Sequence, residues 1–517
     1  TAAEAGIYYI DDILTINSTT AFKLFADMVS SGTDFAGQTI KLGADIDLNN
    51  EEWTPIKVDG YHGAGIVTIE GNGKTITNLS APLFAGGFAG RSGIVIKNLT
   101  IANSNIVSSN TIGSGAFIES VDSMEKIWLE NCHVKKTSIT GGAGSRTGGL
   151  IGWTAGYNNV NDGPVKTYVT IKGCSVIECN ITCDGSVGGL YGHAGNNAWT
   201  YSTVENCTVQ NCTLASTDDG EWRVGVAVGT ANVGELTITN LTESGNVLTQ
   251  TGKEAPTGEK RNYYGRFVPG TTGVLVIDGN AIVGGKDGLA AAIEKGATTI
   301  NLLKGEYIIP SVAQGKTLTF VGLEDNPEAV KVGVTKVGTG GENCDYGLDG
   351  STVTFENITI TTNSSTYIGY ARCKGTYKNC VINGTYTLYD NSIFENCTFN
   401  VSGDVYNIWT WGAPTATFNE CTFNSDGKAM LLYGTADTKL TVNNCTFNDK
   451  GGLTDKKAAI EIGNDYNKSY ELIVNNTTVN GYEINDKGIN TGTTLWANKN
   501  SMSKDKLNVV VDGVDVY

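Results

Sequence analysis

Apolar residues alternate with polar ones in short runs along the chain, and these runs share a recurring phrase. In most of them the alternation ends in Asn followed by a small apolar residue, as in IVIKNLTI and VTFENITI. Strict alternation is the period of a β-strand that is buried on one face. The pattern therefore predicts many short strands. The phrase occupies residues 94–101, 127–134, 169–176, 202–209 and 236–243, and then 353–360, 375–382, 392–399, 416–423, 441–448 and 472–479.

A second, glycine-rich phrase recurs with a similar spacing in the first half of the chain. It reads PLFAG, GAFIE, GGLIG, GGLYG and GVAVG at residues 82–86, 115–119, 148–152, 188–192 and 225–229. Because the two phrases recur together at a similar spacing along the chain, each spacing indicates one structural unit. Because helical periodicity is absent from the repeats, the pattern favours a parallel β-helix over helical repeat arrays. The expected fold class is all-β, a right-handed parallel β-helix (a solenoid).

The Asn of the repeated phrase predicts a corner between strands. Asn tolerates the left-handed conformation that such a corner needs and can hydrogen-bond along the stack. The next residue points inward, and it is Cys at positions 132, 174, 207, 380, 397, 421 and 445. We interpret these cysteines as buried free thiols. A metal site formed by Cys174, Cys179, Cys183 and His193 is the alternative, but the same Cys–x4–Cys spacing recurs at Cys207 and Cys212 without a His.

Two segments have the helical period and precede the repeats. Residues 19–30 place Phe22, Phe25 and Val29 on one face after a capping Ser18, and residues 287–296 form a second such segment. We expect each to be a short N-terminal capping helix that covers exposed strand edges. The polar segment 251–275 is interpreted as a linker. The chain then divides into a first β-helical domain, 1–250, and a second, 276–517.

Composition and charge narrow the classes of partner. Lys and Arg number 36 against 53 Asp and Glu, a net charge of −17, which argues against nucleic acid. No run of 18 apolar residues is present, so no membrane span is predicted. The chain begins at Thr1 with no signal-like segment, which we interpret as a processed form whose targeting segment is missing. The sequence predicts no cofactor and no metal, and it does not indicate a structural Ca²⁺ site.

The first half resembles a known group of proteins. Residues 36–56, 69–80, 83–87 and 93–101, followed by GGLIG and GGLYG, resemble bacterial surface proteins that carry the GLUG repeat. The resemblance covers roughly residues 15–245. The second half resembles the broader pectate-lyase-like β-helix superfamily. The first resemblance implies a bacterial surface protein involved in adhesion, whereas the second superfamily includes polysaccharide lyases, glycoside hydrolases, adhesins and phage tail proteins.

Catalytic chemistry on such a scaffold needs clustered carboxylates beside a basic residue. The best candidate cluster is Asp345, Asp349, Arg372, Lys374 and Asp390, in which stacking would bring Arg372 close to Asp390. The favoured interpretation is a solvated ion pair on an outer face. Only three histidines are present, so no Ser/His/Asp triad is predicted.

Sugar binding by aromatic stacking is the other candidate chemistry. Two excursions, 153–163 and 193–202, follow GGLIG and GGLYG and are expected to lie side by side as loops. Their candidate ligand-binding residues are Trp153, Tyr157, Asn158, Asn159, His193, Asn196, Asn197, Trp199 and Tyr201. The alternative is that these rings fold back over the repeat. A second aromatic stripe, Tyr370, Tyr389, Trp411 and Tyr433, is interpreted as core stacking rather than as an exposed platform.

The function predicted from these observations is that of a non-catalytic extracellular protein at the bacterial cell surface. It would serve adhesion or carbohydrate binding, with a glycan or a host or cell-surface ligand as its partner. Two alternatives stay open: a polysaccharide lyase or glycoside hydrolase of the β-helix type, and a phage receptor-binding fibre.

Overall fold

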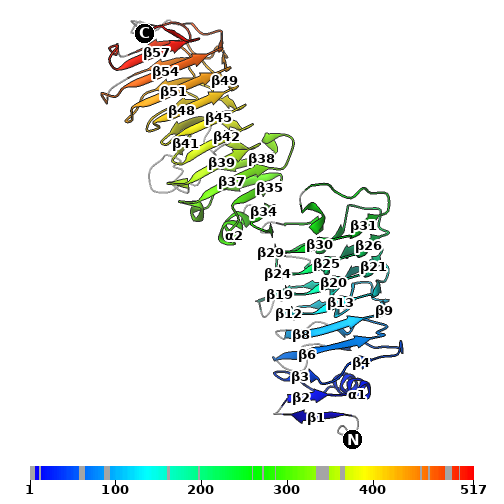
Figure 1. Cartoon of the computed structure of the whole chain (residues 1–517). Coiled ribbons are helices and arrows are strands. Elements are labelled where there is room, and N and C mark those ends of the chain that lie inside the picture. Colours follow the sequence, from blue (N-terminus) through cyan, green and yellow to red (C-terminus); the bar gives the residue numbers. More distant parts are fainter. Residues whose placement is uncertain are drawn as a thin grey trace. The chain divides into compact units, whose positions relative to one another are not determined.

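A computed structural model describes residues 6–10, 13–57, 65–86, 93–159, 163–195, 198–258, 260–270, 273–285, 287–333, 348–360, 367–454, 457–463, 466–483, 492–499 and 501–517. The chain is all-β, with parallel sheets and few helices, and it divides into two units, Thr1–Asp278 and Gly279–Tyr517 (Figure 1). Part of the segment interpreted as a linker belongs to the first unit, because Tyr264–Phe267 form strand β32, which pairs with β28 (Val228–Ala231).

In the first unit, strands from successive repeats pair in parallel and in register. We number four groups of its described strands as sheets I to IV. Sheet I contains β1 (Ile7–Ile10), β2 (Ile13–Ile16), β3 (Thr39–Leu42), β4 (Ile46–Asp47), β6 (Ile66–Thr77), β8 (Gly93–Ala102), β12 (Lys126–Glu130), β13 (His133–Lys135), β19 (Thr167–Lys172), β20 (Ser175–Ile177), β24 (Thr200–Glu205), β25 (Thr208–Gln210), β29 (Glu235–Thr239), β30 (Thr242–Ser244) and β33 (Val274–Ile277). Sheet II contains β9 (Asn105–Val107), β14 (Ser138–Thr140), β21 (Asn180–Cys183), β26 (Thr213–Ser216) and β31 (Val247–Gln250).

Sheets III and IV carry the glycine-rich phrase. Sheet III contains β10 (Gly113–Gly115), β15 (Arg146–Gly148), β22 (Ser186–Gly188) and β27 (Val224–Gly225). Sheet IV contains β5 (Ile56–Lys57), β7 (Phe84–Ala85), β11 (Ile118–Asp122), β16 (Ile151–Ala155), β23 (Tyr191–Ala194), β28 and β32. The backbones of the two sheets touch: a Cβ on Gly152 would lie 2.2 Å from the Ser114 nitrogen, and one on Gly188 would lie 1.9 Å from the Tyr191 oxygen. Only glycine fits there, which explains GGLIG and GGLYG.

In the second unit the repeats pair in the same parallel manner along three sheets, V to VII. Sheet V contains β34 (Asn280–Val283), β35 (Thr299–Leu302), β37 (Thr317–Gly322), β39 (Thr352–Glu356), β42 (Lys374–Lys378), β45 (Ser392–Glu395), β48 (Thr415–Asn419), β51 (Thr438–Asn443), β54 (Tyr470–Asn475), β57 (Leu507–Val511) and the antiparallel β58 (Val514–Asp515). Sheet VI contains β36 (Gly305–Ile308), β38 (Val330–Gly333), β40 (Thr359–Ile360), β43 (Val381–Asn383), β46 (Thr398–Asn400), β49 (Thr422–Ser425), β52 (Thr446–Asp449) and β55 (Thr478–Asn480). Sheet VII contains β41 (Tyr367–Ala371), β44 (Thr385–Leu388), β47 (Ile408–Trp409), β50 (Met430–Leu432), β53 (Ile460–Ile462) and β56 (Trp496–Asn498).

The helices confirm the two helical segments of the sequence. Helix α1 (Thr19–Ser30) begins where the Ser18 hydroxyl accepts a hydrogen bond from the Ala21 N–H, and the Phe22 ring stacks on Trp53 at 5.5 Å. At this end of sheet I the outermost strand is β1, which pairs antiparallel with β2. Helix α2 (Gly288–Glu294) buries Leu289 and Ile293 in the second unit.

Short 3₁₀ turns occupy Arg261–Tyr263, Ser311–Ala313 and Pro327–Ala329. Among the described residues, no helix is long and apolar enough to cross a membrane.

The asparagine corner is confirmed. Every Asn of the predicted column has a positive φ, between 47° at Asn476 and 56° at Asn357. Their side chains bond along the stack, as where the Asn131 amide donates to the Asn98 oxygen at 3.2 Å and Asn476 donates to Asn444 at 2.8 Å. The corner therefore satisfies its amides internally.

The thiols next to this corner are expected to react slowly. Eleven cysteines of the described chain are free and buried, and Cys344 lies outside the described residues. Burial raises the pKa of Cys174 and of Cys380 above that of an ordinary thiol, so the reactive thiolate is scarce at neutral pH. Thiol labelling of the native protein should be slow, and all twelve cysteines should label once the chain is denatured. Disulfides found by mass spectrometry would contradict this prediction.

Candidate functional site

The two excursions of the first unit are not a pair of loops. Trp153 belongs to β16 and His193 to β23, and the two residues are neighbours in the parallel register. The Trp153 side chain is only 9% exposed. The loop interpretation of these two residues was wrong because strand β16 continues past the glycine-rich phrase as far as Ala155, with all five of its residues buried.

The remaining residues of that predicted site are spread over several elements. Tyr157, Asn158 and Asn159 form β17 (Tyr157–Asn159), which makes an antiparallel hairpin with β18 (Gly163–Val165). Asn196 and Asn197 lie outside the described residues. Trp199 is half-buried, and Tyr201 lies on β24 of sheet I, where it stacks on Tyr168 at 5.3 Å. Tyr201 and Trp153 therefore belong to different sheets.

The candidate catalytic cluster of the second unit is only partly assembled. Arg372 forms an ion pair with Asp349 at 3.8 Å and lies 4.9 Å from the centroid of the Tyr389 ring. Asp390 accepts a hydrogen bond from the Asn391 N–H, and among the described ion pairs Arg372 is joined to Asp349 and not to Asp390. Lys374 is exposed on β42, and Asp345 lies outside the described residues. Because these carboxylates do not converge on one point, the described part of the cluster resembles a surface ion pair.

A cluster of four aromatic rings lies at the corner between sheets VII and V, and we call Trp409, Trp411, Tyr433 and Tyr466 the corner rings. Their ring centroids are 5.3 to 6.1 Å apart in five pairs, all of them edge-to-face or tilted. Tyr466 is 44% exposed and the other three are half-buried. The interior side of sheet VII is filled instead by Ile408, Met430, Leu432 and similar residues. For Trp411 and Tyr433 the core-stacking interpretation was therefore wrong.

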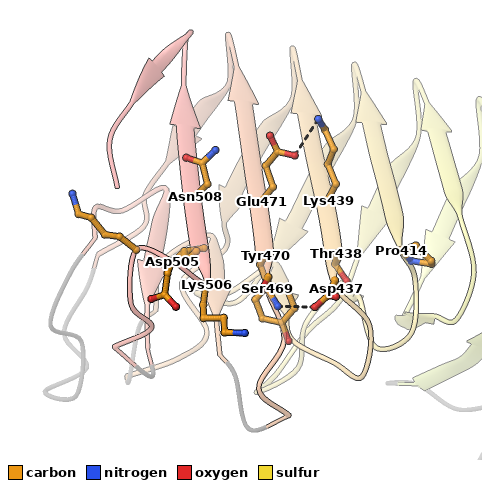
Figure 2. A pocket seen from close by; sticks show the side chains of 12 residues that line it. Pro414, Asp437, Thr438, Lys439, Ser469, Tyr470, Glu471, Asp505, Lys506 and Asn508 are labelled. Atoms are coloured by element: carbon orange, nitrogen blue, oxygen red, sulfur yellow. Dashed lines mark hydrogen bonds and ion pairs between the residues drawn. The ribbon is translucent and has the colours of Figure 1, made fainter.

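A groove of about 390 Å³ lies along the start of β51, β54 and β57 (Figure 2). The outward side chains of Lys439, Glu471 and Asn508 follow one another in register across these strands. Lys439 and Glu471 form an ion pair at 3.1 Å, and the Asp437 carboxylate accepts the Ser469 N–H at 2.8 Å. The lining also contains Lys504, Asp505 and Lys506, so its cations and carboxylates are equal in number, three each. The groove thus offers hydrogen-bond donors and acceptors with no excess of charge.

The corner rings and the groove share the same connecting segments. Residues 411–414, 433–437 and 466–469 each begin at a corner ring and end at a groove residue, namely Pro414, Asp437 and Ser469. Backbone bonds hold these segments to one another: the Thr435 N–H donates to the Trp411 carbonyl at 2.7 Å, and the Lys439 N–H donates to Pro414 at 2.9 Å. The two features therefore form one surface, which we call the aromatic corner.

A buried polar network lies on the same face of sheet VII as Trp409. Glu461 of β53 pairs in register with Leu431, which pairs with Trp409, and the Glu461 side chain is fully buried. The Tyr406 hydroxyl donates a hydrogen bond to the Glu461 carboxylate. The Lys428 ammonium lies 4.4 Å from the Tyr406 ring and pairs with Asp404, and this hydrogen bond and charge lower the pKa of the Asp404 carboxyl.

Some residues of the aromatic corner were not predicted from the sequence. Tyr466, Lys439, Glu471 and Asn508 lie on segments whose adjacency depends on the stacking of repeats. Trp409 lies two residues before Trp411 of the aromatic stripe, but the direction of its side chain depends on strand register. No group of three or more His, Cys, Asp or Glu side chains could hold a metal ion in the part of the chain that the structure describes.

Comparison with known proteins gives no family. No family model matches the sequence, and no curated protein matches it. Among solved structures, a candidate immunoglobulin A1 protease from Bacteroides ovatus is 14% identical, with 72% of this chain and 85% of that chain covered and a TM-score of 0.28. A mutant of the PL6-family alginate lyase AlyGC is 11% identical, with 96% and 99% covered and a TM-score of 0.21. TM-scores of this size carry no argument about function.

Proposed function

We propose that the chain is an extracellular carbohydrate-binding protein whose glycan site is the aromatic corner of the second unit. The proposal rests on one observation. The same three connecting segments, 411–414, 433–437 and 466–469, carry partly exposed aromatic rings and also line a polar groove. Rings of this kind stack on the apolar faces of sugar residues, while amides and charged groups bond to the hydroxyls. Because the groove has no excess of either charge, a neutral glycan is the ligand class that fits best.

The scaffold that we propose for this site is a right-handed parallel β-helix in each unit. The in-register parallel pairing of successive repeats and the stacked asparagine corner support it. Such a scaffold would place equivalent side chains one strand spacing apart, about 4.8 Å, which suits a polymer that itself repeats. Location at a bacterial surface, a role in adhesion and a relationship to GLUG-repeat proteins belong to the same proposal and rest on the sequence resemblance.

Replacing Trp411 by Ala should weaken glycan binding by about 30-fold, since an aromatic anchor of this kind contributes about 2 kcal/mol. The ring is half-buried, so the melting temperature should change little. Calorimetric titration with a panel of soluble polysaccharides (a neutral glucan, a galactomannan and a polyuronate) measures both affinity and preference.

The matched control is Tyr168→Ala, which removes a ring that is 51% exposed on the first unit. It should leave affinity unchanged. A second variant, Lys439→Ala, opens the ion pair in the groove and should weaken binding without touching a ring. Full affinity in both the Trp411 and Lys439 variants would refute the aromatic corner as the site. Loss of affinity in the Tyr168 variant would place the glycan on sheet I instead.

A further inference from the structure

Sheets III and IV of the first unit enclose a polar layer that the proposed glycan site does not use. A Cβ built on Gly113 of sheet III would lie 2.8 Å from the Trp153 Cβ of sheet IV, so these two positions face each other. Two repeats further on, the Ser186 hydroxyl bonds to the Thr230 hydroxyl at 2.7 Å. In both pairs, the residue of sheet III faces the residue of sheet IV that belongs to the next repeat. We call this the offset between the two sheets.

The same offset places a basic residue opposite an imidazole. In sheet III, Arg146 pairs in register with Gly113 on one side and Ser186 on the other. In sheet IV, His193 pairs with Trp153 on one side and Thr230 on the other. Arg146 therefore faces His193 in the polar layer.

Two further arginines of this layer have carboxylate partners. Arg223 lies 3.1 Å from the Asp218 carboxylate, and Arg266 forms an ion pair with Glu221. Both pairs combine a half-buried guanidinium with a nearby counter-charge. The positive charge at this end of the layer is thus neutralised within the chain.

Arg146 and His193 lack such partners within the described residues. In the described part of the chain no carboxylate lies within ion-pair distance of Arg146, whose guanidinium donates only to the Ile112 carbonyl at 3.3 Å. The His193 Nε2 atom is buried and has no hydrogen-bond partner among the described residues. Burial, together with the charges of Arg146, Arg223 and Arg266, lowers the pKa of His193 to about 3. The imidazole is therefore neutral at physiological pH.

We infer that Arg146 and His193 form a binding site for an oxyanion, a carboxylate or a sulfate. A partly buried guanidinium without a counter-ion is unfavourable, and an oxyanion supplies the missing charge. The planar guanidinium donates two parallel hydrogen bonds to such a group, and the Nε2–H of His193 donates a third. Trp153 beside His193 provides an apolar wall. The inference concerns the first unit and is independent of the aromatic corner.

Histidine NMR of the full chain tests this site directly, because the sequence contains only three histidines. Sodium sulfate is titrated at constant ionic strength, with chloride as the balancing anion, and the His193 signal is assigned with His193→Gln. We expect a saturable shift of that signal alone and a rise of the His193 pKa from about 3, because an adjacent anion favours the imidazolium form. The absence of a saturable shift would overturn the inference.

Two substitutions of Arg146 distinguish a direct contact with sulfate from an effect of the protein's net charge. Arg146→Gln should reduce sulfate affinity at least tenfold, and Arg146→Lys, which keeps the charge but loses the two-pronged donor, should give a smaller loss. Lys253→Gln removes one exposed cation elsewhere and should leave the titration unchanged. Equal effects of the Arg146 and Lys253 substitutions would mean that sulfate acts only through net charge, which would refute the site.

The source of the oxyanion is distinguished by comparing acetate with a short uronate oligosaccharide in the same NMR titration. Tenfold tighter binding of the oligosaccharide, lost in Arg146→Gln, would support a sugar-borne carboxylate. Equal affinities would support a free ion as the ligand. Failure of both ligands to shift His193 would refute the oxyanion site and would leave the neutral-glycan proposal for the second unit untouched.

Discussion

Replacing Gly188 by Ala is expected to destabilise the first unit by about 3 kcal/mol, at the upper end of the cost of overpacking a core. A Cβ at this position would lie 1.9 Å from the Tyr191 carbonyl oxygen and 2.8 Å from the Gly229 nitrogen. These are backbone atoms of two neighbouring repeats, so no side chain can rotate to make room. The sheets would have to separate, and the buried contacts between them would be lost. Urea-induced unfolding, followed by far-ultraviolet circular dichroism, measures the change.

Gly73→Ala is the matched control for this experiment. Its φ is +71°, but no atom lies within 4 Å of the position where a Cβ would be built. The added methyl group therefore meets only the strain of a left-handed conformation, about 1 kcal/mol. Equal losses in the two variants would contradict the close approach of sheets III and IV.

Replacing Phe394 by Ala should cost about 3 to 5 kcal/mol in the second unit. The ring is fully buried and stacks between Tyr377, at 4.3 Å, and Phe418, at 4.8 Å, within a column of rings contributed by successive repeats. Its removal leaves a cavity that neighbours fixed in register cannot close. Thermal unfolding in a calorimeter, compared with the unchanged protein, measures the loss.

The neighbouring residue supplies the control. Ile393 precedes Phe394 on β45, points to the other face and is 42% exposed. Ile393→Ala should change the free energy of unfolding by about 0.5 kcal/mol or less. A loss in Ile393→Ala as large as that in Phe394→Ala would show that the two faces of this strand are assigned incorrectly.

Features that depend on a few adjacent residues were predictable. Helix α1 follows its capping Ser18 and apolar period, the asparagine corners adopt positive φ, and the cysteines beside them are buried. Each of these outcomes depends on the conformational preference or polarity of a residue and its near neighbours. The aromatic stripe shows the limit of such reasoning. Trp411 and Tyr433 were interpreted as core residues, whereas both rings are half-buried in the structure. The face that a side chain occupies depends on strand register, since a shift of one residue moves it to the other face.

The sequence by itself determined the period of the repeats, the strand alternation and the corner residues, because these are properties of local backbone and side-chain chemistry. Only the tertiary structure decided which side chains from different repeats meet. It brought Trp411 and Tyr466 together with the groove lined by Lys439 and Glu471. It also placed Arg146 opposite His193, and it placed Trp153 in strand β16 and not in a loop. The physical reason is strand register. Contacts between repeats depend on which residues of neighbouring repeats pair with one another, and on how closely glycine lets two sheets approach. Neither is encoded in any single stretch of residues.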